Sequence, residues 1–211
     1  MSNLWIKICG INQAGEAETV AQLGADALGV ILHAASPRAV AVEECELLLS
    51  GIGQGITRFA VLVDPTQLQV SQVLATGVID SLQFHGEESA AFCEQFGVPY
   101  SKAIRVRNYD QALKLVESHP EASLFLLDTY KQGVAGGTGK QFDWSLAARL
   151  VESIEKPVIL AGGLNPENLP LAIEQVNPWG VDVVSGVERS PAVKDMKKVK
   201  QFIEAGRHVR R

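Results

Sequence analysis

The sequence predicts a closed barrel of eight parallel strands, each followed by a helix, which is the (βα)8 or TIM barrel. Short apolar runs rich in Val, Ile and Leu recur along all 211 residues, and each is followed by a stretch of helical length and period. The first and last of eight such runs begin at Leu4 and Val181, so they recur about every 25 residues. Runs 59–63 and 124–127 are apolar at successive positions, which is typical of parallel strands covered on both faces.

Each apolar run marks an expected strand. The strands are expected to begin at Leu4, Ala27, Thr57, Ser81, Tyr100, Leu124, Val158 and Val181. The helical period between them predicts helices over residues 14–23, 42–49, 68–75, 89–96, 109–116, 145–154, 168–176 and 194–205. An open dinucleotide-binding sheet would carry a GxGxxG fingerprint after its first strand, and this chain lacks one there. No linker-like stretch divides the chain, so we expect residues 1–211 to form one barrel domain, with 207–211 as a frayed, solvated end.

Composition narrows the possible partners. Hydrophobic residues make up 46% of the chain, and no apolar run approaches the ~18 residues of a membrane span. A net charge of −5 with 6% aromatic residues argues against a nucleic-acid partner. The three cysteines have no CxxC spacing and the four histidines are scattered, which disfavours a disulfide framework or a metal site. Without a signal-peptide pattern, we expect a cytoplasmic protein that has no contact with a membrane.

The ends of the first and sixth runs offer an acid and a base. Active sites of such barrels lie where the strands end. Cys9 closes the first run, where a thiolate would be a base or nucleophile, although a buried, inert thiol is the alternative. Asp128 closes the sixth run and would act as a general acid if apolar surroundings keep it protonated, whereas capping the next loop is its alternative role.

Glycine clusters after the sixth, seventh and eighth strands predict a phosphate site. They comprise Gly137, Thr138 and Gly139, then Gly162 and Gly163, then Ser185 and Gly186. Glycine lets backbone N–H groups approach an anion closely, and barrels often bind phosphate at these loops. Tight strand-to-helix turns are the alternative explanation. We therefore expect a small phosphorylated substrate.

Two further side chains are candidate ligand contacts. Arg38 follows Ser36-Pro37, which pins the backbone and presents the guanidinium to a carboxylate or phosphate. His85 begins the turn into the fourth helix, where it could pack against a ligand.

Together these positions resemble the phosphoribosylanthranilate isomerase family of tryptophan biosynthesis. The resemblance rests on Lys7-Ile8-Cys9-Gly10, Ser36-Pro37-Arg38, Leu82-Gln83-Phe84-His85-Gly86, Gly136 through Trp144, Leu160 through Leu164, and Ser185-Gly186-Val187-Glu188. It implies that Cys9 is the general base, that Asp128 is the general acid and that Arg38 holds the substrate carboxylate. The implied reaction is an Amadori rearrangement of N-(5-phosphoribosyl)anthranilate that needs no cofactor. We expect a monomer or homodimer.

Three stretches depart from the family pattern. His33-Ala34-Ala35 stands where the family commonly has an aromatic residue and a lysine, Val184 replaces a serine, and Ala192 replaces a glycine. The first bears on the anthranilate side of the pocket and the others on the phosphate loops. Two rivals remain open: a histidine-pathway type of isomerase, which would be expected to carry aspartate at position 9, and a phosphosugar-binding barrel without catalysis.

Overall fold

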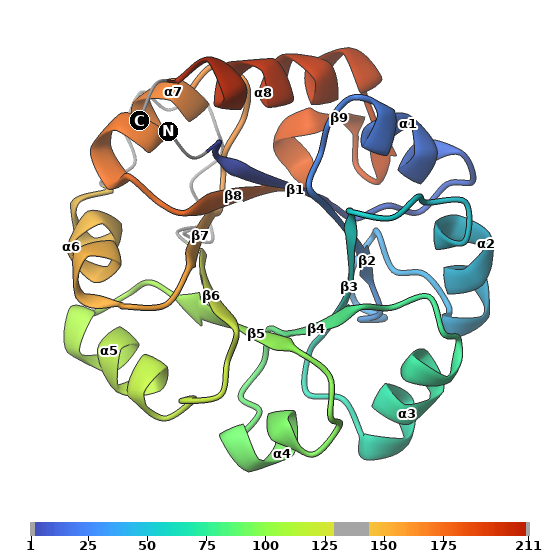
Figure 1. Cartoon of the computed structure of the whole chain (residues 1–211), viewed down its shortest axis with the longest axis horizontal. Helices are drawn as coiled ribbons and strands as arrows, with labels where there is room; N and C mark the ends of the chain where they lie inside the picture. Colours follow the sequence, from blue (N-terminus) through green and yellow to red (C-terminus); the bar gives the residue numbers. More distant parts are fainter. Residues whose placement is uncertain (1–2, 129–143, 210–211) are drawn as a thin grey trace.

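The strands form the closed barrel that the sequence predicts. The computed structural model describes residues 3–128 and 144–209. Eight parallel strands pair in chain order, and β8 pairs with β1 to close the ring (Figure 1). They are β1 Trp5–Cys9, β2 Ala27–Ile31, β3 Thr57–Leu62, β4 Ser81–Phe84, β5 Tyr100–Arg105, β6 Leu124–Asp128, β7 Val158–Ala161 and β8 Gly180–Val183.

Helices surround the barrel on its outside (Figure 1). They are α1 Glu16–Gln22, α2 Cys45–Leu49, α3 Gln67–Ala75, α4 Ala90–Glu94, α5 Tyr109–Glu117, α6 Ser145–Ser153, α7 Leu169–Val176 and α8 Met196–His208, with 3₁₀ turns at Val42–Glu44 and Ser185–Val187. The main apolar core lies between strands and helices, and Cys45 and Cys93 are buried in it. No helix among the described residues is long and apolar enough to cross a membrane.

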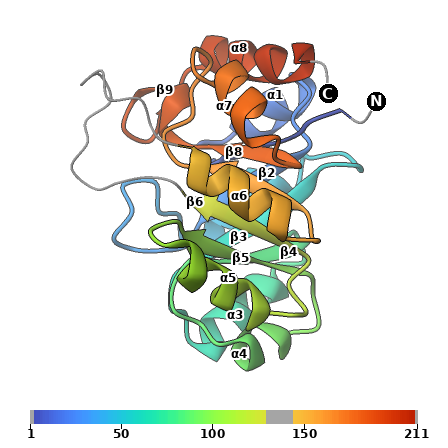
Figure 2. The same cartoon turned by 90° about the vertical axis from the view of Figure 1, so that its left-hand side faces the viewer.

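The chain also contains a short antiparallel pair that sequence reasoning missed. Strands β9 (Glu188–Ser190) and β10 (Val193–Lys194) follow the barrel. The expected helix from residue 194 therefore begins at Met196. Asp195 caps it, because its carboxylate accepts the backbone N–H of Lys197 at 2.9 Å. Figure 2 shows β9 at the opposite end of the barrel from the N-terminus, which is the end where the strands finish.

The expectation of a frayed end from residue 207 is wrong for Arg207. Its guanidinium donates to the carbonyls of Leu4 and Gly24 and lies 2.8 Å from the Asp26 carboxylate. Asp26 also accepts the backbone N–H of Ile6 at 2.7 Å. The last turn of α8 is therefore tied to the start of β1, because a long side chain at the helix end reaches carbonyls that no strand partner satisfies.

The barrel interior combines a small apolar layer with buried charges. Every second residue of β5, β6 and β7 points inward, and these inward residues form a cluster of their own, made of Ala103, Leu126, Ile159 and Ala161. Lys7 and Lys102 are fully buried. Buried ammonium groups need partners, so each lysine indicates a polar arrangement built into the barrel.

Candidate active site

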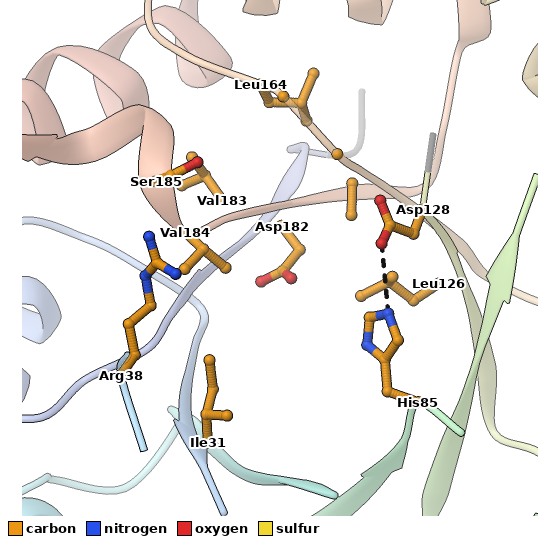
Figure 3. A pocket seen from close by; sticks show the side chains of 13 residues that line it. Ile31, Arg38, His85, Leu126, Asp128, Leu164, Asp182, Val183, Val184 and Ser185 are labelled. Carbon is orange, nitrogen blue, oxygen red and sulfur yellow. Dashed lines mark ion pairs between the residues drawn. The ribbon is translucent and has the colours of Figure 1, made fainter. Parts of the chain in front are cut away.

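A pocket of about 300 Å³ opens where the strands end (Figure 3). Its lining consists of Ile31, Arg38, His85, Leu126, Asp128, Ala161, Gly162, Gly163, Leu164, Asp182, Val183, Val184 and Ser185. Arg38, His85, Asp128, Gly162, Gly163 and Ser185 were expected at the site from the sequence, whereas Asp182 was not. The expected contacts Gly137, Thr138 and Gly139 lie outside the described residues.

Asp128 and His85 lie next to each other on the pocket wall. Asp128 ends β6, and its Oδ2 lies 3.4 Å from Nε2 of His85, with both side chains about a quarter exposed (Figure 3). The amide nitrogen of Gln83 lies 3.5 Å from the other ring nitrogen of His85.

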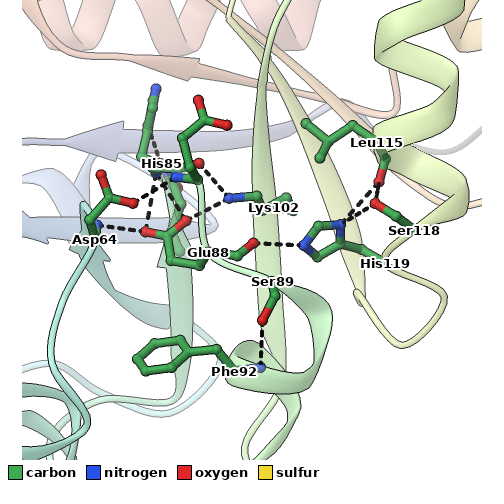
Figure 4. A network of polar contacts seen from close by, with 12 residues as sticks. Asp64, His85, Glu88, Ser89, Phe92, Lys102, Leu115, Ser118 and His119 are labelled. Carbon is green, nitrogen blue, oxygen red and sulfur yellow. Dashed lines mark hydrogen bonds and ion pairs between the residues drawn. The ribbon is translucent and has the colours of Figure 1, made fainter.

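A buried polar network fixes the turn that carries His85 (Figure 4). The Lys102 ammonium lies 2.5 Å from a Glu88 carboxylate oxygen and donates to the Gly86 carbonyl at 2.6 Å. Glu88 in turn accepts the backbone N–H groups of Asp64 at 2.8 Å and of Gly86. A Cβ at Gly86 would lie 2.3 Å from an Asp64 oxygen, so this turn requires glycine. Lys102 and Glu88 were not singled out from the sequence, because the pair forms only when β5 and the turn after β4 come together.

Cys9 is not among the residues that line the pocket. It ends β1, is 2% exposed, and lies two residues after the buried Lys7 on the same face of the strand. The Lys7 ammonium lies 3.0 Å from Oδ1 of Asp182. Burial raises the pKa of the Cys9 thiol above its ordinary value, while the charge of Lys7 opposes that rise. Lys7 and Lys194 favour the thiolate, but burial outweighs them.

Arg38 already holds one carboxylate. Its Nε and Nη2 donate to the two oxygens of Glu188 at 2.6 and 2.7 Å, and Lys194 lies 3.4 Å from the same carboxylate. Burial of Glu188 favours its neutral form, but Arg38 and Lys194 outweigh this and hold the pKa of Glu188 below its usual value. This bidentate pair fixes the guanidinium at the pocket and leaves Nη1 as the nitrogen that Glu188 does not engage.

The loops after β7 and β8 meet backbone to backbone. Gly162 and Gly163 have φ values of 90° and 70°, in the left-handed region that favours glycine. Gly186, in the 3₁₀ turn after β8, approaches so closely that a Cβ would lie 1.8 Å from the Leu164 carbonyl oxygen. Gly186 does not line the pocket itself, but it lets Ser185 and the Gly162-Gly163 turn share one wall.

Comparison with known proteins agrees with this arrangement. A family model described as N-(5'phosphoribosyl)anthranilate (PRA) isomerase matches residues 6–205. An N-(5'-phosphoribosyl)anthranilate isomerase from Pseudomonas fluorescens strain Pf0-1 is 43% identical over 98% of this chain and 100% of its own length. Its counterpart from Cellvibrio japonicus is 44% identical over 96% of this chain and 93% of its own.

Solved structures give the same result. The phosphoribosyl anthranilate isomerase of Thermotoga maritima superposes with a TM-score of 0.87 at 33% identity, covering 96% of this chain and 98% of that one. An isomerase crystallised with reduced 1-(o-carboxyphenylamino)-1-deoxyribulose 5-phosphate has a TM-score of 0.84 at 30% identity, with the same coverage. A thiamine phosphate pyrophosphorylase from Pyrococcus furiosus, 18% identical with a TM-score of 0.69, shares the fold alone. The chain therefore belongs to the family of N-(5'-phosphoribosyl)anthranilate isomerases.

Proposed function

We propose that this protein catalyses the Amadori rearrangement of N-(5-phosphoribosyl)anthranilate to 1-(2-carboxyphenylamino)-1-deoxyribulose 5-phosphate, with Asp128 as general acid and Cys9 as general base. The observation that carries the assignment is the placement of the two groups. Asp128 lines the pocket at the end of β6, and Cys9 ends β1, with β7 and β8 between the two strands. A substrate seated in the pocket can thus meet an acid and a base from different directions.

The acid opens the sugar ring. Asp128 gives its proton to the ribose ring oxygen while the bond from that oxygen to carbon 1 breaks. The bond's electron pair leaves with the oxygen, and the nitrogen lone pair forms the C=N bond of an iminium ion. The oxygen is a poor leaving group without this proton, so the step needs a general acid. His85 orients the carboxyl group, because its Nε2 lies 3.4 Å from Oδ2 of Asp128.

The base then removes a carbon-bound proton. The Cys9 thiolate takes the proton from ribose carbon 2, the released electrons form a double bond between carbons 1 and 2, and the iminium nitrogen recovers its lone pair. The resulting enol amine gains a proton at carbon 1 and loses its hydroxyl proton to give the ketone. The positive iminium acidifies carbon 2, so an acid and a base suffice for the chemistry.

Two contacts hold the anionic ends of the substrate. Arg38 binds the anthranilate carboxylate with the part of its guanidinium that Glu188 leaves available. Backbone N–H groups of the Gly162-Gly163 and Ser185-Gly186 turns bind the phosphate, together with the Gly137–Gly139 segment that the sequence adds. The ligand named in a related isomerase carries both a carboxyphenyl and a 5-phosphate group, in keeping with these two contacts.

We further propose that the whole chain works as one domain in the cytoplasm, without a nucleic-acid partner. Three unpaired, buried cysteines suit a reducing compartment. A relative from Thermotoga maritima is described as dimeric and was also obtained as monomers, so we propose a monomer or homodimer here. Sedimentation of the purified protein tests this choice.

The direct test is turnover of freshly made substrate. We expect the purified protein to remove the fluorescence of N-(5-phosphoribosyl)anthranilate, and Cys9→Ala and Asp128→Asn each to lower kcat by ~10²- to 10⁴-fold. Cys45→Ala is the matched cysteine control, because Cys45 is buried in α2 and does not line the pocket. This variant should keep kcat within about a factor of two of the unaltered enzyme, since the side chain does not contact the substrate.

Two outcomes would contradict the proposal. Binding of the substrate without turnover would favour a phosphosugar-binding barrel, and turnover that survives in folded Cys9→Ala or Asp128→Asn would reject the assigned residues. Unchanged melting temperatures of the variants confirm that any loss lies in catalysis.

A further inference from the structure

Lys7 is a buried charge that the reaction steps above do not use. It sits inside the barrel on β1 with a fully buried side chain, and its register partner on β8 is Asp182. The Lys7 ammonium lies 3.0 Å from Oδ1 of Asp182 and 5.4 Å from the centre of the Phe59 ring. Asp182 itself lines the pocket, so the ion pair joins the barrel interior to the site.

Cys9 and Lys7 meet above Gly29 on β2. Cys9 is the register partner of Gly29, and Lys7 lies two residues earlier on the same face of β1. A Cβ at Gly29 would lie 2.6 Å from the sulfur and 3.2 Å from the Lys7 nitrogen. Any side chain there would push the two groups apart, so the absence of one at position 29 lets the thiol and the ammonium share this space.

Other charges also face Cys9, from β8, β10 and the loop after β2. Asp182 opposes ionisation of the thiol, whereas Lys194 favours it. Arg38 is within electrostatic reach as well. Lys194 and Arg38 are both paired with Glu188, and Lys194 also donates to the Val184 carbonyl at 3.0 Å. Of the three cations that act on Cys9 in the described part of the chain, Lys7 is the one whose nitrogen shares the space over Gly29 with the sulfur.

We infer that Lys7, held in place by Asp182, is a positioning residue that stabilises the Cys9 thiolate and so sets how much of the enzyme carries a competent base. The inference rests on the proposed role of Cys9. Lys7 keeps its own proton throughout, since the proton from ribose carbon 2 goes to the Cys9 sulfur. That step turns the thiolate beside the Lys7 ammonium into a neutral thiol.

The electrostatics of the cluster support this division of roles. Burial disfavours the charge of Lys7, but Asp182 and Cys9 outweigh burial and raise the pKa of Lys7, so it is an ammonium at neutral pH. Burial raises the pKa of Cys9, and among the influences that oppose the rise Lys7 is the largest. Without Lys7 the thiolate would form only at still higher pH.

The test is a pH titration of the Cys9 thiolate in the folded protein. Ultraviolet absorbance reports thiolate, and subtracting the same titration of the matched Cys9→Ser protein removes the signals of Cys45, Cys93 and the tyrosines. Three backgrounds are compared with the unaltered chain. Lys7→Arg keeps the cation, Asp182→Asn removes only the carboxylate, and Lys7→Met/Asp182→Asn removes both charges and leaves no buried charge unpaired in their place.

The expected shifts differ in sign. Asp182→Asn should lower the titration midpoint, because Lys7 then acts without its counter-charge. The double variant should raise the midpoint by one pH unit or more, which is roughly a tenfold loss of thiolate at a given pH below the midpoint. In Lys7→Arg the Cys9 thiolate should titrate within about half a pH unit of the unaltered chain. The arginine would then remove most of the midpoint shift that the double variant shows.

A purely structural role for Lys7 gives another pattern. If Lys7 only neutralises Asp182, the double variant titrates like the unaltered chain, and that result would overturn the inference. If a single variant does not fold, the double variant alone decides between the two roles. A double variant that does not fold would also contradict the inference, because the barrel should tolerate a neutral pair in place of Lys7 and Asp182. The titration needs no turnover, so it is separate from the proposed function, which fails instead if Cys9→Ser retains full kcat.

Discussion

Arg38 faces two carboxylates, one from the chain and one that we assign to the substrate. Glu188 occupies the Nε and Nη2 side of the fork at 2.6 and 2.7 Å and fixes the plane of the guanidinium. A guanidinium has five N–H donors in a rigid fork, so a second carboxylate can bind another edge. Glu188 thus serves the site by holding Arg38 in one orientation before the substrate arrives.

Arg38→Ala should chiefly raise KM, because the carboxylate contact persists from substrate to transition state. Losing a charge-assisted contact of ~1.5–3 kcal/mol lowers kcat/KM roughly 10- to 150-fold. Steady-state kinetics with a substrate analogue that lacks the carboxylate identifies the partner. If Arg38→Ala discriminated against that analogue as strongly as the unaltered enzyme does, Arg38 would bind something else.

The pH dependence of stability should reveal the Glu188 carboxylate. Its pKa is lowered in the folded protein, so its stabilising contribution is present above the unfolded value of about 4.3 and is lost as pH falls through the folded value. Chemical denaturation should therefore find the largest difference between the unaltered chain and Glu188→Gln near neutral pH, and a shrinking difference in acid. If the stability difference did not change with pH, the pKa of Glu188 would not be lowered in the folded protein.

At the scale of elements, the turn between β4 and α4 is built on a buried ion pair. Lys102 and Glu88 are both almost wholly buried, and between them they engage the backbone at Gly86 and Asp64. His85 begins this turn, so the pair determines where the imidazole meets Asp128. In the proposed mechanism the β4 end acts by positioning His85 beside Asp128, and Asp128 and Cys9 supply the acid and the base.

Lys102→Met should lower the free energy of unfolding by ~3–5 kcal/mol, because it leaves Glu88 buried without its cation. The double variant Lys102→Met/Glu88→Gln should recover part of that loss, since no uncompensated charge remains. Chemical denaturation of both measures the difference. Equal losses in the single and double variants would mean that the pair contributes only through packing.

The link between β9 and β10 holds a strained residue. Ala192 has φ of 65°, a left-handed conformation that costs a side-chain-bearing residue about 1–2 kcal/mol. Its carbonyl accepts the Asn12 side-chain amide at 3.1 Å, which ties the link to the loop after β1. The family pattern commonly has glycine here, so the departure seen in the sequence has a conformational consequence.

Ala192→Gly should raise the unfolding free energy by up to ~1 kcal/mol. The relief of backbone strain exceeds the ~0.4–1 kcal/mol lost because glycine makes the unfolded chain more flexible. Thermal denaturation tests this, with Ala122→Gly as a control at a position without positive φ, which should lose stability. A loss at both positions would show that the strain at Ala192 is negligible.

Over the whole molecule, the apolar period predicted the barrel because it follows from local spacing. Six of the eight expected strand starts match the structure, and the other two differ by one residue. The same pattern placed Cys9 and Asp128 at the ends of apolar runs, and they end β1 and β6 in the structure. The β9–β10 pair was missed because strands of two or three residues leave no periodic signal.

The partners of the site residues could not be predicted, because they depend on barrel closure. Lys7 and Asp182 lie 175 residues apart, and Arg38 and Glu188 lie 150 apart. Each pair meets only when the β1 and β8 ends of the chain come together in a definite register. The sequence shows which residues carry charge, whereas closure decides which of them neutralise one another.

Deuterium at ribose carbon 2 gives the most direct test of Cys9 as base and Asp128 as acid. Under conditions where chemistry limits the rate, a weakened base makes the removal of that proton more rate-limiting. We therefore expect Cys9→Asp, which keeps a carboxylate base, to retain more activity than Cys9→Ala and to show a larger isotope effect on kcat than the unaltered enzyme. Asp128→Asn should be slow without that enlargement, because it impairs ring opening. An enlarged isotope effect in Asp128→Asn but not in Cys9→Asp would show that the two roles are reversed.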